Sequence, residues 1–84
     1  MTSAGDIRTQ LMAAMERFPF GPLAQSATDF DQARAIVAQT ASGSSSAELA
    51  TAQSQIAAAS DHVQQAAQLC HAAQASLQDF LSRV

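Results

Sequence analysis

Residues 47–83 read AELATAQSQIAAASDHVQQAAQLCHAAQASLQDFLSR, and this stretch decides the fold. It contains no proline or glycine and is rich in alanine, glutamine and leucine, which are good helix formers. Its apolar residues recur at alternating spacings of three and four, the repeat of a helix that packs along another helix. A helix of this length would extend about 55 Å at 1.5 Å per residue. The members of the repeat are Leu49, Ala52, Ile56, Ala59, Val63, Ala66, Cys70, Ala73, Leu77, Phe80 and Val84.

The repeat has a finer pattern, in which large apolar residues alternate with alanine. Alanine fills one of the two heptad positions four times before Phe80 takes it. Small residues at every second contact allow a second helix to approach closely. The flanking positions are mostly Gln, Ser, His and Ala, so interhelical salt bridges do not select the partner. We therefore predict that the line from Leu49 to Phe80, called the seam below, contacts other helices.

A first helix is predicted at about residues 5–18. Ile7, Leu11 and Phe18 share one helical face with Ala14 or Met15, and Asp6 can cap the start of the helix. The sequence Phe18-Pro19-Phe20-Gly21-Pro22 then ends it, because two prolines and a glycine interrupt helical hydrogen bonding. We place the break at 19–22.

A second helix is predicted at about 23–41, with Phe30, Ala33 and Val37 on its apolar face and Ile36 beside them. Its start has two alternatives: Gly21-Pro22 opens it, because proline fits the first helical position, or Thr28-Asp29-Phe30-Asp31 caps a later start. A serine-rich turn follows at 42–46. Ser45 and Glu48 have the spacing of a capping box at the start of the long helix, 47–83.

These segments predict one all-α domain over residues 1–84, an antiparallel helical hairpin whose first arm is broken by proline, making three helices. A chain of this length buries a limited core and usually needs a disulfide, a metal or a partner. Cys70 is the single cysteine, so no internal disulfide can form. We therefore expect a partner: a second copy in a homodimer, or a similar helical protein, giving a four-helix-type bundle.

Composition argues against several classes of function. The formal net charge is −3 and the only basic residues besides histidine are four arginines, a poor basis for nucleic-acid binding. No apolar run is long enough to span a membrane. The N-terminus does not have the form of a conventional signal peptide. The expected location is the cytoplasm, with non-classical secretion left open.

No pattern of catalytic or metal-binding residues is found. His62 and His71 lie nine residues apart and at different angles around the helix, so they cannot share a metal as histidines four apart can. Cys70 lacks a basic neighbour that would activate it. We therefore expect no enzyme activity, no catalytic residue, no metal and no cofactor. The residues Phe18, Phe20 and Leu23 form either a structural corner or a docking corner, on which two aromatic rings anchor a partner.

Two helical arms of similar length joined by a short turn, in an acidic chain rich in alanine and glutamine, resemble the WXG100 (ESAT-6-like) helical hairpins. The resemblance is architectural and covers most of the chain: the turn is Ser42-Gly43-Ser44, and the chain contains no tryptophan or tyrosine. It implies an antiparallel dimer and a role as substrate or structural partner in type VII secretion. The chain also resembles uncharacterised small, alanine-rich helical proteins of actinobacteria.

The function expected from the sequence is a non-enzymatic protein–protein interaction or assembly module that acts through the seam. The alternative is a regulatory inhibitor, such as an antitoxin, an immunity protein or a secretion chaperone, whose helices complete a bundle with a target protein.

Overall fold

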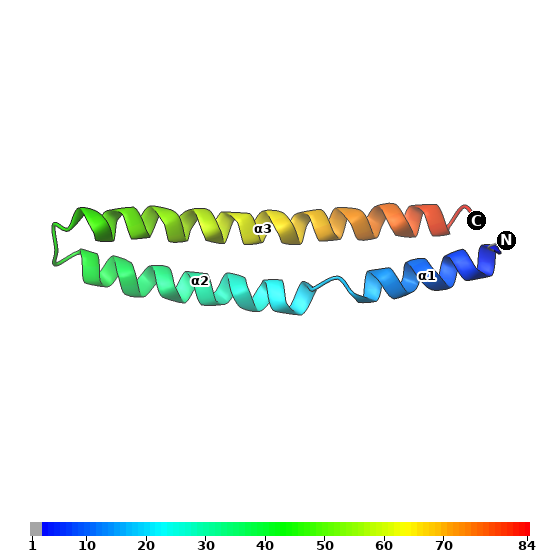
Figure 1. The fold of residues 1–84 in the computed structure, drawn as a ribbon, viewed down its shortest axis with the longest axis horizontal. Helices are drawn as coiled ribbons and strands as arrows, with labels where there is room; N and C mark the ends of the chain where they lie inside the picture. The colour runs from blue at the N-terminus through cyan, green and yellow to red at the C-terminus, as the bar shows by residue number, and fades with distance from the viewer. Residues whose placement is uncertain (1–2) are drawn as a thin grey trace.

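The structure is a computed structural model that describes residues 3–84, and it is all-helical over that range. Helix α1 spans Ala4–Glu16, α2 spans Phe20–Ala41 and α3 spans Ala47–Leu81. α1 and α2 follow one another along α3, which runs in the opposite direction, so the described ends of the chain lie at the same end of the molecule (Figure 1). The molecule measures 64 × 19 × 15 Å. The predicted all-α class and the hairpin-like shape are confirmed.

A capping box starts α1. The Ser3 hydroxyl accepts a hydrogen bond from the Asp6 backbone N–H (3.1 Å), and the Asp6 carboxylate accepts one from the Ser3 N–H (3.4 Å). Ser3 is therefore the N-cap, and Asp6 occupies the third helical position, where a negative charge suits the helix dipole. Asp6 therefore helps to cap the helix, as expected, but it does so from the third helical position and not as the N-cap residue.

The break in the first arm lies at residues 17–19, before the predicted 19–22. Pro19 is the N-cap of α2, and Phe20–Pro22 form its first turn. A helix tolerates Pro22 there because backbone N–H groups of the first turn have no partner within the helix. The alternative start at Thr28 is wrong: Thr28 lies inside α2, and its hydroxyl donates to the Ala24 carbonyl at 3.2 Å.

The turn between α2 and α3 comprises residues 42–46. The capping box predicted from Ser45 and Glu48 does not form. Ser46 is the N-cap of α3 and makes no side-chain capping bond, while its N–H donates to the Ser44 hydroxyl at 3.1 Å. The sequence contains three consecutive serines, and spacing alone did not identify which of them ends the turn.

One line of contact between α2 and α3 holds most of the hairpin together. Phe30, Ala33 and Val37 are half-buried against α3, whereas Ile36 points outward and is 65% exposed. Among residues 3–84 only Ser60 (0% exposed) and Leu81 (7% exposed) are buried. Two helices cover each other on one side only, so a larger enclosed core does not form.

Ser60 marks a point of close approach. Its residue is 0% exposed and its hydroxyl has no hydrogen-bond partner. Leaving a buried hydroxyl unsatisfied costs about 1–3 kcal/mol. Ser60 is buried in a contact where larger neighbouring side chains remain partly exposed. We therefore infer that its small size, and not hydrogen bonding, makes serine suitable at this position.

We predict that Ser60→Ala stabilises the hairpin by about 1 kcal/mol, because it removes an unsatisfied buried hydroxyl at almost constant volume. Ser60→Leu should destabilise it by about 1–3 kcal/mol, because a larger side chain forces the helices apart. Urea denaturation followed by circular dichroism measures both changes in the free energy of unfolding.

The matched control is Ser54→Ala, at an exposed position of α3. Both alanine variants gain the same helix propensity, so the extra gain at position 60 isolates the buried hydroxyl. Equal gains at the two positions would contradict this account of Ser60.

Candidate interaction surface

The structure divides the predicted seam into a covered section and a mixed one. In the section nearer the turn, α3 directs the seam toward α2, whereas toward the C-terminus the seam residues Ala73 and Phe80 are exposed. Gln74 and Leu81 take the inward positions there instead. The half-buried members of the seam are Leu49, Ala52, Ile56, Ala59, Val63, Ala66, Cys70 and Leu77.

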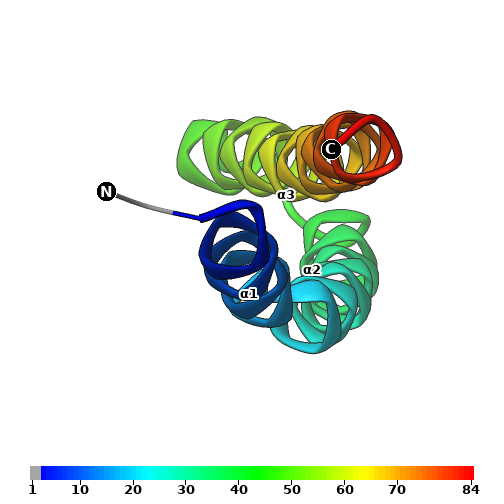
Figure 2. The ribbon, with the colours of Figure 1, turned by 90° about the vertical axis from the view of Figure 1, so that its right-hand side faces the viewer.

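Helix geometry explains this change. A straight α-helix has 3.6 residues per turn, so its contact face drifts by about 20° per heptad relative to a strict seven-residue repeat. Viewed along the long axis, α3 crosses obliquely over the first arm, and α1 is displaced sideways from α2 (Figure 2). The face that α3 presents to the first arm therefore moves from Ala73 and Phe80 to the adjacent Gln74 and Leu81.

Large apolar side chains remain uncovered on the C-terminal half of α3. Leu69 is 69% exposed and Phe80 is 45% exposed. They lie eleven residues apart, so they point within about 20° of each other and about 16 Å apart along the helix. Ala73 and Ser76 are exposed between them. We call this set of four residues, Leu69, Ala73, Ser76 and Phe80, the outer stripe.

Three members of the outer stripe, Leu69, Ala73 and Ser76, lie in an uncharged region of α3, and Phe80 directly follows its end at Asp79. Between Asp61 and Asp79 the sequence contains no Asp, Glu, Lys or Arg. Asp79 forms an exposed ion pair with Arg83, one turn further on, at 3.1 Å. The surface around the stripe therefore consists of apolar groups, amides, hydroxyls and histidines.

The predicted docking corner packs against the chain's own α3. Phe18, Phe20 and Leu23 are half-buried. The rings of Phe18 and Phe20 meet edge-on with centroids 6.1 Å apart, and the Phe20 ring lies 4.5 Å from that of His71. The sequence showed no signal for the Phe20–His71 contact, because it depends on the antiparallel register of the two arms.

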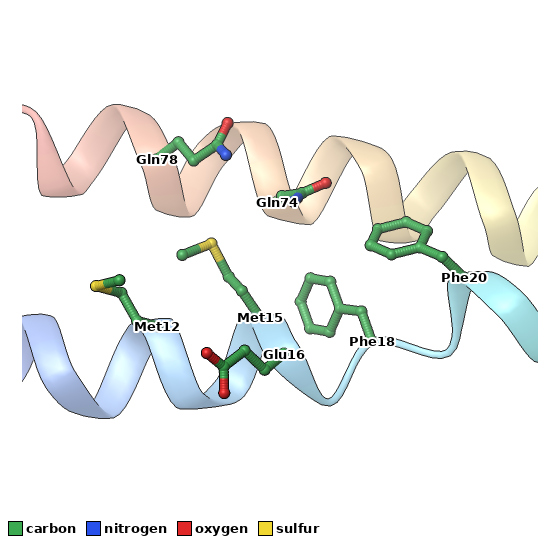
Figure 3. Close-up of a pocket in the computed structure, with 7 residues that line it drawn as sticks. All are labelled: Met12, Met15, Glu16, Phe18, Phe20, Gln74 and Gln78. Atoms are coloured by element: carbon green, nitrogen blue, oxygen red, sulfur yellow. The ribbon is translucent and has the colours of Figure 1, made fainter.

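A groove of about 350 Å³ opens between α1 and α3 beside this corner. Figure 3 shows Met15, Phe18 and Phe20 directed toward α3, from which Gln74 and Gln78 extend. Methionine side chains adapt to differently shaped apolar groups, and glutamine amides both donate and accept hydrogen bonds. The groove is lined by Met12, Met15, Glu16, Phe18, Phe20, Gln74 and Gln78.

Groups that could carry chemistry are dispersed. Cys70 is half-buried in the seam, and His62 is exposed. Within residues 3–84 no group of three or more His, Cys, Asp or Glu side chains is placed to hold a metal ion. Over the same range no helix has the length and hydropathy needed to cross a membrane.

Arg8 ties α1 to the end of α3. Its guanidinium donates to the backbone oxygens of Leu81 (2.9 Å) and Val84 (3.4 Å). A cation at this place also suits the negative end of the α3 dipole. No local sequence pattern indicates this role, because Arg8 and Leu81 are brought together only by closure of the hairpin.

Comparisons with protein-family models, with curated proteins and with solved structures found no match to this chain.

We predict that Arg8→Gln weakens the attachment of α1 and lowers the free energy of unfolding by about 0.5–1 kcal/mol, since Arg8 is exposed and its hydrogen bonds are partly screened. Trypsin should cut faster after Arg17, in the break, when α1 detaches more often. Arg34→Gln on α2 is the control and should leave that cleavage rate unchanged. Equal rates in the Arg8→Gln variant and the unmodified chain would contradict the role of Arg8.

Proposed function

We propose that this chain is a non-enzymatic interaction module whose helices pair with those of another polypeptide. The supporting observation is the surface that the hairpin leaves uncovered. The chain exposes 6022 Å². A compact monomer of its mass, 8.7 kDa, exposes about 4,700 Å².

The excess of roughly 1,300 Å² is large enough for a stable interface, because each partner in a standard protein–protein interface contributes about 800 Å². An elongated hairpin with two buried residues in the range 3–84 gains little from its own core. Pairing with further helices would cover the exposed apolar side chains and supply the missing burial.

The outer stripe is the surface best suited to this pairing. It carries the exposed Leu69 and Phe80 on a rigid helix, with small residues between them that allow a second helix to approach. The Ala-rich seam has a divided role in this proposal: the section nearer the turn binds α2 within the chain, and the exposed members Ala73 and Phe80 serve the partner. A four-helix arrangement then forms where α1 and α3 of two hairpins meet.

The corner and the groove between α1 and α3 form a second candidate surface. Phe18, Phe20 and Leu23 anchor the corner on α3, and Met12 remains exposed at the edge of the groove. The architectural resemblance to WXG100 hairpins agrees with an interaction role, and export by a type VII system remains a separate proposal that rests on that resemblance alone.

We predict that the melting temperature of the isolated chain rises with protein concentration, because association stabilises the folded state by mass action. Circular dichroism melts between 1 and about 100 µM would measure it, with sedimentation equilibrium reporting the oligomer. Mass action predicts this rise in melting temperature whichever helices of the associating chains are in contact.

A chain that is fully helical, monomeric and cooperative at every concentration would contradict the proposed function, because it would need no partner to complete its fold. A poorly helical chain that does not self-associate would favour the alternative role, in which a target protein completes the bundle.

A further inference from the structure

We propose that the partner is a second copy of this chain, and that the two α3 helices pack antiparallel along their outer stripes. The twofold axis passes between Ala73 and Ser76. This inference rests on the proposed function and specifies its interface.

The outer stripe is complementary to itself in one antiparallel register. With the axis between Ala73 and Ser76, Leu69 of one copy lies opposite Phe80 of the other, and Ala73 lies opposite Ser76. The two large side chains then meet at both ends of the contact, and the small residues meet in its centre. A twofold interface requires this reciprocity, since each residue pair occurs twice.

Charge favours the antiparallel direction over the parallel one. Parallel pairing in register would set the two Asp79 carboxylates beside each other, next to Phe80. In the antiparallel register the two Asp79 side chains lie about 13 Å apart along the helix axis, and each faces the uncharged region of the other α3. Antiparallel helix dipoles also attract each other.

The chain has a net charge of −3, so the uncharged region of α3 is favourable for contact between two copies. Two copies of an acidic chain repel each other wherever their carboxylates approach. The region of α3 between Asp61 and Asp79 contains no Asp, Glu, Lys or Arg, so two copies can bring Leu69, Ala73 and Ser76 together without burying a charge. Asp79, beside Phe80, is exposed and paired with Arg83.

The register also sets the shape of the dimer. The α3 helices overlap over about residues 65–84 and the hairpins extend in opposite directions, so the dimer is roughly 100 Å long. One chain measures 64 Å along its longest axis. In the overlap the α1 and α3 helices of both copies lie together, which makes four helices. A dimer that overlapped along its full length would remain near the length of one chain.

The register can be tested with two variants, Leu69→Lys and Phe80→Asp, studied separately and as a mixture. Both positions are exposed, so each variant should retain the helicity of the unmodified chain. Alone, each should raise the dimer dissociation constant by roughly tenfold or more, because a charge replaces an apolar contact at both ends of the interface. Mixed, they should form a heterodimer, in which Lys meets Asp at one end and Leu69 meets Phe80 at the other. Native mass spectrometry counts the three dimers.

Ile36→Lys is the matched control, since it adds the same charge at an exposed apolar position of α2, outside the stripe. It should leave the dissociation constant within about twofold, as expected for a charge outside an interface. Met12→Lys tests the groove as a competing surface. Dissociation by Met12→Lys but not by Leu69→Lys would overturn the inference, as would a mixture with no preference for the heterodimer.

The failure of this inference is distinguishable from failure of the proposed function. A dimer that Leu69→Lys and Phe80→Asp leave intact, or that small-angle X-ray scattering shows to be no longer than the 64 Å of one chain, overturns the register and preserves the function. A chain that does not self-associate and becomes helical only with a different protein overturns self-pairing alone. A fully helical, cooperative monomer overturns both.

Discussion

Two packed helices share a single line of contact, and this limit governs the rest of the molecule. A side chain in that line is covered by the opposite helix but stays open at its edges, which is why Phe30 and Val63 are only half-buried. Ser60, with its small side chain, is fully buried, and Leu81, near the start of α1, is 7% exposed. The free energy gained by burying apolar surface is therefore distributed over many half-buried side chains, and the hairpin exposes more area than a compact chain of its size.

Local periodicity was sufficient to predict much of the fold. α3 carries no residue that interrupts a helix, so its start at Ala47 and its length followed from the sequence. The apolar faces of the first arm were also predictable, since Ile7, Leu11, Met15 and Phe18 repeat every three or four residues, and all are half-buried. Each of these features depends on side chains within one helix.

Features that depend on two helices escaped prediction. The seam predicted from the seven-residue repeat includes Ala73 and Phe80, and the drift of a straight helix against that repeat leaves both exposed to solvent in the single chain. The break lies at 17–19 and not at the predicted 19–22, because a helix tolerates Pro22 in its first turn. Contacts of Arg8 and of Phe20 with α3 link residues far apart in sequence, so no local pattern reveals them. The predicted seam and the outer stripe both lie on α3, but only the three-dimensional structure shows which of these side chains the first arm covers.

The serine-rich turn has a consequence for the order in which the chain assembles. It satisfies its own backbone: the Ser42 N–H donates to the Ala38 carbonyl and the Ser44 N–H to that of Ala41. Contacts beside the turn close short loops, whereas the Arg8–Leu81 contact closes one of more than seventy residues, and longer loops cost more entropy. We therefore expect folding to proceed from the turn outward and hydrogen exchange to be fastest at the open end. The outer stripe lies toward that end. A second copy bound there would therefore stabilise the part of the hairpin that its own contacts stabilise least.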